Sequence, residues 1–182
     1  CDVSGLFICT YDEREGCCVA NYTFVFAHYV SLIFHYRSSL RRTNSSRSSS
    51  NSRSSSIGHQ KIEWVRRNMP ILNQLEDQFA QELPFADKRV TVCIHLEAKT
   101  AYLALVLRAG GATVSVTGSN PESTKDDVVA ALAAEGLHVY ARHGASPEEM
   151  RRYMSIALEL QPHVVIDDGG DLVELLHESQ RQ

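Results

Sequence analysis

The chain has 182 residues, of which 43% are hydrophobic and 22% charged, a balance typical of a globular protein rather than of a fibrous or wholly disordered one. Its net charge of −4 argues against a nucleic-acid or membrane-binding surface that covers the whole chain. No apolar run reaches the roughly 18 residues that a membrane-spanning helix needs.

Residues 1–56 differ from the rest in charge and composition. They carry four acidic and six basic residues, whereas residues 57–182 carry 18 acidic and 12 basic ones. Residues 24–36 are apolar but too few to span a membrane, and their acidic flank is unlike that of a signal peptide. Residues 37–56 contain 11 Ser and 5 Arg, which predicts low-complexity chain; an RNA-binding Arg/Ser segment is the alternative. We expect residues 1–56 to be a disordered or weakly structured extension, unrelated to residues 57–182.

From residue 57 onward, helical and strand patterns alternate. Apolar residues three and four positions apart predict a first helix that kinks or restarts at Pro70. Capping signals mark two later helix starts, a Ser123/Asp126 capping box and Ser146 followed by Pro147. In chain order, the predicted elements are a helix at 61–82, a strand at 89–94, a helix at 98–108, a strand at 112–116, a helix at 123–135, a strand at 137–141, a helix at 146–160, a strand at 163–166 and a helix at 171–177.

This alternation, with strands that are apolar almost throughout, predicts an α/β fold with a doubly wound parallel sheet. Ligands of such sheets bind beyond the carboxyl ends of the strands. We therefore expect a site among residues 95–100, 117–126 and 167–171. No G-x-G-x-x-G and no P-loop occurs, so the sequence supports no nucleotide-phosphate site.

Two of these segments contain groups that transfer protons. His95 directly follows a predicted strand, so its imidazole should lie at the carboxyl edge of the sheet, where it could transfer protons. Asp167 and Asp168 follow another strand, and either could face the cleft as an acid or base or as an acceptor for ribose hydroxyls, while Asp171 could cap the next helix. A divalent-cation site, as in receiver-type domains, is the alternative for these carboxylates.

Three long motifs carry a specific resemblance: CIHLEAKTAYLALVLRAGGATV, TGSNPESTKDDVVAALAAEGLHVYA and VVIDDGGDLVELLH. From Gln60 onward the chain resembles the adenosylhomocysteinase (S-adenosyl-L-homocysteine hydrolase) family. The resemblance implies that residues 57–182 are part of its Rossmann/flavodoxin-like substrate-binding domain. It implies reversible, NAD-dependent hydrolysis of S-adenosyl-L-homocysteine to adenosine and L-homocysteine, in the methyl cycle of one-carbon metabolism, by a cytoplasmic homotetramer.

The same resemblance assigns roles to individual residues. His95 and Asp168 correspond to catalytic groups at the ribose 5′ side. Substrate-binding positions correspond to Glu97, Lys99, Thr100, Ser123 and Asp168. No residue of this chain corresponds to the NAD-binding domain, and no metal is implied, so we expect a nucleoside thioether as the partner and a chain that is inactive by itself.

Two substitutions depart from the common form of the family. Glu97 stands where Thr is usual and Lys99 where Glu is usual, as in the HLEAKTA form of an archaeal and thermophilic-bacterial branch. Because Lys can only donate hydrogen bonds, altered recognition of the base is expected, with tolerance of hypoxanthine. A non-enzymatic, receiver-like binding module and an Arg/Ser-rich RNA-associated protein are the alternative functions.

Overall fold

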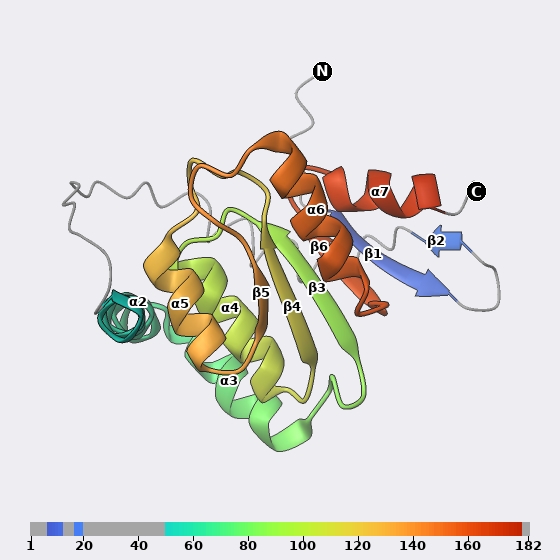
Figure 1. Ribbon diagram of the computed structural model, residues 1–182. Coiled ribbons are helices and arrows are strands. Elements are labelled where there is room, and N and C mark those ends of the chain that lie inside the picture. The colour runs from blue at the N-terminus through green and yellow to red at the C-terminus, as the bar shows by residue number, and fades with distance from the viewer. Residues whose placement is uncertain (1–6, 13–16, 20–49, 180–182) are drawn as a thin grey trace.

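Six strands form one sheet in the order β2-β1-β6-β3-β4-β5 (Figure 1). The computed structural model describes residues 7–12, 17–19 and 50–179, with side chains for residues 53–178. Four strands run parallel, which confirms the predicted sheet. They are β6 (Val164–Asp167), β3 (Arg89–Ile94), β4 (Thr113–Gly118) and β5 (His138–Tyr140). The antiparallel strands β1 (Phe7–Asp12) and β2 (Cys17–Val19) extend the sheet beyond β6.

Helices cover both faces of the parallel strands (Figure 1). One face carries α4 (Ala98–Ala109) and α5 (Asp126–Ala134), on which α2 (Ser50–Asn68) and α3 (Pro70–Glu82) pack from outside. The other face carries α6 (Pro147–Leu158) and α7 (Asp171–Ser179). Every residue of α4 from Thr100 to Leu107 is buried, as expected for a helix enclosed on all sides.

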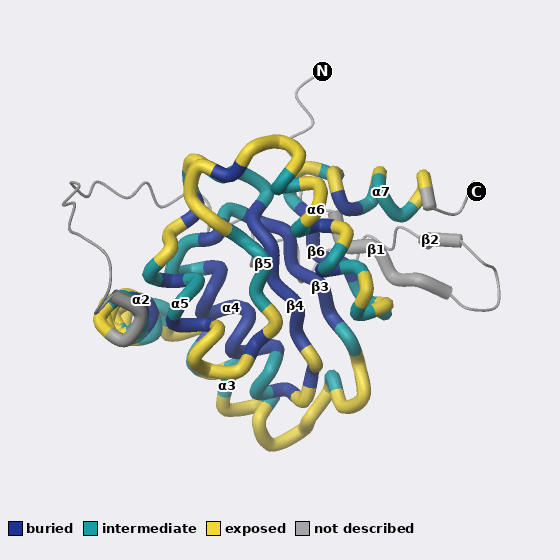
Figure 2. Tube along the Cα trace, viewed as in Figure 1, coloured by how far each residue is buried: buried dark blue, intermediate teal, exposed yellow. Residues whose placement is uncertain are grey.

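The central strands are buried on both sides (Figure 2). Their alternation sends one set of side chains to the α4–α5 face, where Val92 and Val116 join the main core. The opposite set is small and partly polar, and includes Thr91, Cys93 and Thr117. On this second face Cys93 and Val165 join apolar side chains of α6 and α7, Met154 and Leu172, in a smaller apolar cluster.

Most predicted elements lie within a few residues of those observed. The first helix begins at Ser50, earlier than predicted, so the end of the Ser/Arg-rich segment is helical. It breaks at Met69, and α3 restarts with Pro70, because proline is tolerated in the first helical turn. Ser146 is the N-cap of α6, as predicted, and it also forms a reciprocal capping box with Glu149, which was not predicted.

The capping box predicted at Ser123 and Asp126 is wrong. Helix α5 begins at Asp126 after Lys125, and its N-cap makes no side-chain hydrogen bond. The Ser123 hydroxyl instead contacts Asn120 and His95. A hydroxyl engaged in this way cannot cap the helix.

Only parts of the N-terminal extension are described, as β1, β2 and the first turns of α2. The apolar run at 24–36 and most of the Arg/Ser segment lie outside the described residues. No helix in the described part of the chain is both long and apolar enough to cross a membrane.

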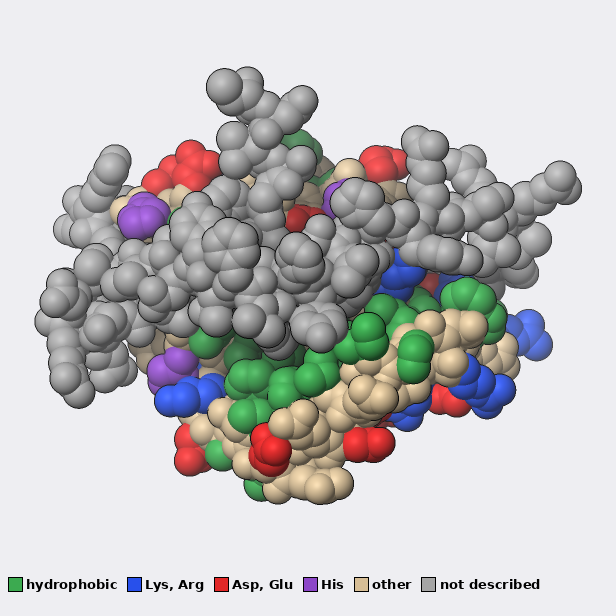
Figure 3. Space-filling model, turned by 180° about the vertical axis from the view of Figure 1, so that it is seen from behind, with side chains coloured by type: hydrophobic (Ala, Val, Ile, Leu, Met, Phe, Trp, Pro, Cys, Tyr) green, Lys and Arg blue, Asp and Glu red, His purple; other side chains and the backbone are tan. Residues whose placement is uncertain are grey.

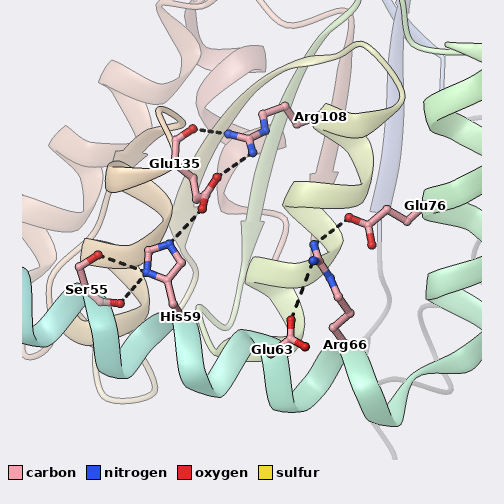
Figure 4. Close-up of polar contacts among 7 residues, drawn as sticks. All are labelled: Ser55, His59, Glu63, Arg66, Glu76, Arg108 and Glu135. Atoms are coloured by element: carbon pink, nitrogen blue, oxygen red, sulfur yellow. Dashed lines mark hydrogen bonds and ion pairs between the residues drawn. The ribbon is translucent and has the colours of Figure 1, made fainter.

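Helix α2 is fixed to α5 by close packing and by charge. A Cβ atom at Gly58 would lie 2.0 Å from the Asp127 carbonyl oxygen, so this crossing requires glycine. At the next residue, Nε2 of His59 lies 3.0 Å from Oε1 of Glu135, whose other oxygen binds Arg108 at 3.0 Å (Figure 4). The position of α2 is thus set by α5 and by the end of α4.

The rear face of the molecule carries a band of apolar side chains between charged ones (Figure 3). The largest exposed apolar side chains in the described part belong to α2, α3 and their ends: Ile57, Trp64, Ile71 and Leu83.

Candidate functional site

The strand order places two strand ends at a switch point. From β3 the chain passes through α4, β4 and α5 to β5 on one side, and then returns through α6 to β6 on the other side of β3. The carboxyl ends of β3 and β6 therefore lie next to each other where the winding reverses, which is where open α/β sheets bind ligands. His95 follows β3 and Asp168 follows β6.

His95 and Asp168 meet at this point. Nε2 of His95 lies 3.9 Å from Oδ2 of Asp168, and the same oxygen accepts the His95 backbone N–H at 3.3 Å. The imidazole is 44% exposed, whereas the carboxylate is only 16% exposed. A partly open imidazole beside a largely buried carboxylate can exchange a proton with a ligand while the carboxylate stabilises its charged form.

The loop after β4 supplies a third group. The Ser123 hydroxyl lies 2.6 Å from Nδ1 of His95 and 3.0 Å from the Asn120 carbonyl oxygen. All three segments predicted to line the site therefore converge on His95. The sequence indicated only a turn at Asn120. In the structure the side chain of Asn120 accepts the Glu122 amide at 2.9 Å, and this turn fixes the direction of the Asn120 carbonyl.

The remaining predicted substrate positions lie in the turn after His95 and at the start of α4. Thr100 is 6% exposed, and its hydroxyl donates to the His95 carbonyl at 2.6 Å. Glu97 is the N-cap of α4 without a side-chain cap, and Lys99 lies in the first turn; both are partly exposed. Thr100 therefore contacts His95 directly. Glu97 and Lys99 are near these two residues in the sequence, as members of the same turn and helix start.

The two adjacent aspartates have different environments. Asp167 is fully buried, and its carboxylate accepts the backbone amides of Leu172 and Val173 at 2.8 and 3.3 Å. Burial raises the pKa of Asp167, and the amides oppose that shift. Asp167, rather than Asp171, thus holds the start of α7, which leaves Asp168 as the acid that meets His95.

These contacts disfavour the cation-site alternative. The Asp167 oxygens are already bound to backbone amides. Within residues 53–179 no group of three or more His, Cys, Asp or Glu side chains is arranged to hold a metal ion.

Cys93 pairs with Asp167 in the β3–β6 register, next to the site. Burial, and then the negative charges of Asp167, Asp168 and Asp171, raise the pKa of its thiol well above the ordinary value. A thiol held in this way stays protonated and is not a nucleophile.

The described residues do not fit NAD. A pyrophosphate needs a glycine-rich turn after the first strand, whereas the turn after β3 is His95-Leu96-Glu97. Gly118, at the end of β4, lies against the protein itself, since a Cβ atom there would be 2.8 Å from the Thr124 hydroxyl.

The fold and this geometry define a doubly wound α/β domain with a histidine–aspartate pair at its switch point. The chain belongs to the S-adenosyl-L-homocysteine hydrolase family, whose profile matches residues 49–182. It is 50% identical over 125 residues to an adenosylhomocysteinase of Pyrococcus abyssi and 48% identical over 120 residues to an S-inosyl-L-homocysteine hydrolase of Methanocaldococcus jannaschii. These alignments cover 69% and 66% of this chain but only 30% and 29% of the relatives. An adenosylhomocysteinase of Thermotoga maritima is 45% identical, with 69% of this chain and 31% of the relative covered.

Proposed function

We propose that this chain binds a nucleoside thioether of the S-adenosyl-L-homocysteine type at the switch point and provides the proton-transfer groups for its reversible hydrolysis to the nucleoside and L-homocysteine. The observation that carries the proposal is the contact of His95 with Asp168 at adjoining strand ends. Family membership supports the choice of substrate class.

The reaction at the thioether carbon needs a group that acts as a general acid in one step and as a general base in another. When the carbon–sulfur bond breaks by elimination, the departing sulfur takes up a proton; when water adds, it gives one up. His95 can do both, since its imidazole is partly exposed and an imidazole nitrogen can accept a proton and later donate it. Asp168 would stabilise the imidazolium.

Hydride chemistry at the ribose would come from NAD, as the resemblance implies. Because the described residues do not fit that cofactor, we propose that the 182-residue chain assayed alone with NAD shows no turnover. Release of homocysteine thiol, measured with a thiol reagent after removal of free protein, tests this directly. Turnover above the buffer rate would contradict it.

The base of the substrate is a second open choice, since an adenosylhomocysteinase and an S-inosyl-L-homocysteine hydrolase match this chain to similar degrees. Hypoxanthine presents a carbonyl at position 6 and an N–H at position 1, whereas adenine presents an amino group and an unprotonated nitrogen. A carboxylate at Glu97 and an ammonium at Lys99 match the donor and acceptor of hypoxanthine. We propose that the chain binds inosine at least as well as adenosine.

Nuclear magnetic resonance titration of the chain with each nucleoside tests both proposals. We expect the amide signals of His95, Ser123 and Asp168 to shift on addition of nucleoside. Inosine should bind at least as tightly as adenosine, and Lys99→Glu should move the preference toward adenosine. Shifts confined to other elements would overturn the site, and a clear preference of the unchanged chain for adenosine would overturn the base assignment alone.

Three further assignments complete the proposal. Residues 1–56 form an extension and residues 57–182 the substrate domain; the family match begins at residue 49, inside the extension, and β1 and the first turns of α2 join the extension to the domain. The protein works in the cytoplasm. It forms a homo-oligomer, a tetramer by the resemblance, and sedimentation velocity measures that state.

A further inference from the structure

Ser123 is placed to set which nitrogen of His95 carries the proton. The resemblance implies that Ser123 binds substrate, and within the protein its hydroxyl contacts His95 and Asn120. Its oxygen lies 2.6 Å from Nδ1 of His95 and 3.0 Å from the carbonyl oxygen of Asn120. A serine hydroxyl has one hydrogen, so it can donate to only one of these two atoms.

The direction of each bond follows from the chemistry of the partners. A carbonyl oxygen only accepts, so the contact with Asn120 is a hydrogen bond only if Ser123 donates. The hydrogen between Ser123 and the imidazole must then come from Nδ1. In the neutral ring, Nε2 is left with a lone pair and can act as the base.

The opposite arrangement satisfies fewer groups. If Ser123 donated to Nδ1, the proton would sit on Nε2, whose near protein acceptor is Oδ2 of Asp168 at 3.9 Å. That separation is too long for a hydrogen bond, and this oxygen already accepts the His95 amide. Thr124 also donates to the Asn120 carbonyl, from its amide at 3.2 Å and its hydroxyl at 3.0 Å, so this oxygen would keep partners either way. In both arrangements Nε2 has no hydrogen-bond partner among the described residues, so what separates them is the Ser123 hydrogen bond to the Asn120 carbonyl, which only the first arrangement keeps.

We propose that Ser123, directed by the Asn120 carbonyl, is a positioning residue that holds His95 with the proton on Nδ1 and the Nε2 lone pair toward Asp168 and the ligand. The asparagine turn holds the carbonyl in place, because Oδ1 of Asn120 accepts the Glu122 amide. When Nε2 takes up a proton, it forms the ion pair with Asp168. The catalytic meaning of this arrangement rests on the function proposed above, whereas the arrangement itself does not.

The test uses the full 182-residue chain labelled with ¹⁵N and no ligand. A long-range ¹H–¹⁵N spectrum of the imidazoles, recorded in alkaline solution where the rings are neutral, separates protonated from unprotonated nitrogens. The His95 signals are identified by their loss in His95→Gln. In the unchanged chain we expect the protonated type at Nδ1 and the unprotonated type at Nε2.

Variants of the same loop then isolate the hydroxyl. Ser123→Ala should bring the two nitrogen shifts toward each other, because both tautomers become populated, and Ser123→Thr should keep them apart. Ser119→Ala is the matched control, because the Ser119 hydroxyl has no hydrogen-bond partner among the described residues. It should leave the His95 signals unchanged.

Two results would overturn the proposal: a proton on Nε2 in the unchanged chain, or a Ser123→Ala spectrum with the separation intact. If Ser123→Ala fails to fold, the spectrum of the unchanged chain still tests the proposal, because it shows which nitrogen of His95 carries the proton. Since no nucleoside is present, a wrong tautomer leaves the proposed function standing, and a correct tautomer without nucleoside binding counts against the function alone.

Discussion

Oδ2 of Asp168 serves both the backbone and the ring of His95: it accepts the His95 amide at 3.3 Å and lies 3.9 Å from Nε2. The two residues follow β3 and β6, which are paired in the sheet. One carboxylate oxygen therefore holds the strand end in place and faces the imidazole. This coupling makes the site a product of the sheet order rather than of any local motif.

The crossing of α2 over α5 gives a first prediction. Gly58→Ala should lower the free energy of unfolding by about 2 kcal/mol, because the new methyl group would meet the Asp127 carbonyl and force the helices apart. Urea unfolding followed by circular dichroism measures the change. Gln60→Ala, at an exposed position of the same helix, serves as the control and should change stability little. Equal stabilities for the two variants would contradict this packing.

The contacts of Glu135 predict a dependence on pH. Hydrogen bonds from Arg108, and then from His59, lower the pKa of Glu135. A carboxylate whose pKa is lowered by folding stabilises the fold at neutral pH, and this contribution is lost as the pH falls through the acid range. The stability difference between the unchanged chain and Glu135→Gln should therefore be present at pH 7 and vanish in acid.

The matched control for this experiment is Glu159→Gln, at an exposed position after α6. Its effect on stability should be small and should vary little with pH. A Glu135→Gln difference that grows as the pH falls would have the wrong sign and would contradict the network in Figure 4.

Buried hydroxyls on the α6 face of the sheet give a pair of opposite expectations. Thr117 is 1% exposed, and its hydroxyl has no partner among the described residues, so Thr117→Val should leave stability unchanged or raise it. Thr91 donates to the Ala157 carbonyl at 3.3 Å, so Thr91→Val should cost about 1 kcal/mol. Thermal unfolding of both variants provides the comparison, and a larger loss for Thr117→Val would contradict the assignment of partners.

Cys93 should be chemically inert in the folded chain. Burial, with the nearby carboxylates, raises the pKa of its thiol, so little thiolate exists at neutral pH. Peptide mapping after treatment with iodoacetamide should find the Cys93 peptide unmodified in the native protein and fully modified in urea. Rapid modification of the native protein would show that the β3–β6 junction is open.

The sequence alone predicted much of the fold, because the period of apolar residues and the turn signals are local. The strand at Arg89–Ile94 and the helix start with Ser146 as N-cap and Pro147 as first residue were confirmed. The first helix was placed too late, since its opening turns at residues 50–56 contain few apolar residues and the helix packs through Gly58 instead. Tertiary contact of this kind leaves no periodic signal.

The site was predictable in outline and not in detail. The rule that ligands bind at strand ends selected His95 together with the pair Asp167 and Asp168. The sequence could not choose between Asp167 and Asp168, because that choice depends on which side chain turns under α7. It also assigned Ser123 to a helix cap, since the competing partner, His95, lies far away along the chain.

The central claim is that His95 and Asp168 act on one bound nucleoside, and a double-mutant cycle on nucleoside affinity tests it most directly. Dissociation constants for inosine would be measured for the unchanged chain, His95→Gln, Asp168→Asn and the double variant. Each single change should weaken binding by about 1 kcal/mol, roughly fivefold. The double variant should lose less than the sum of the two, because residues that share a ligand are coupled. Strict additivity, or single variants that bind as tightly as the unchanged chain, would contradict the account.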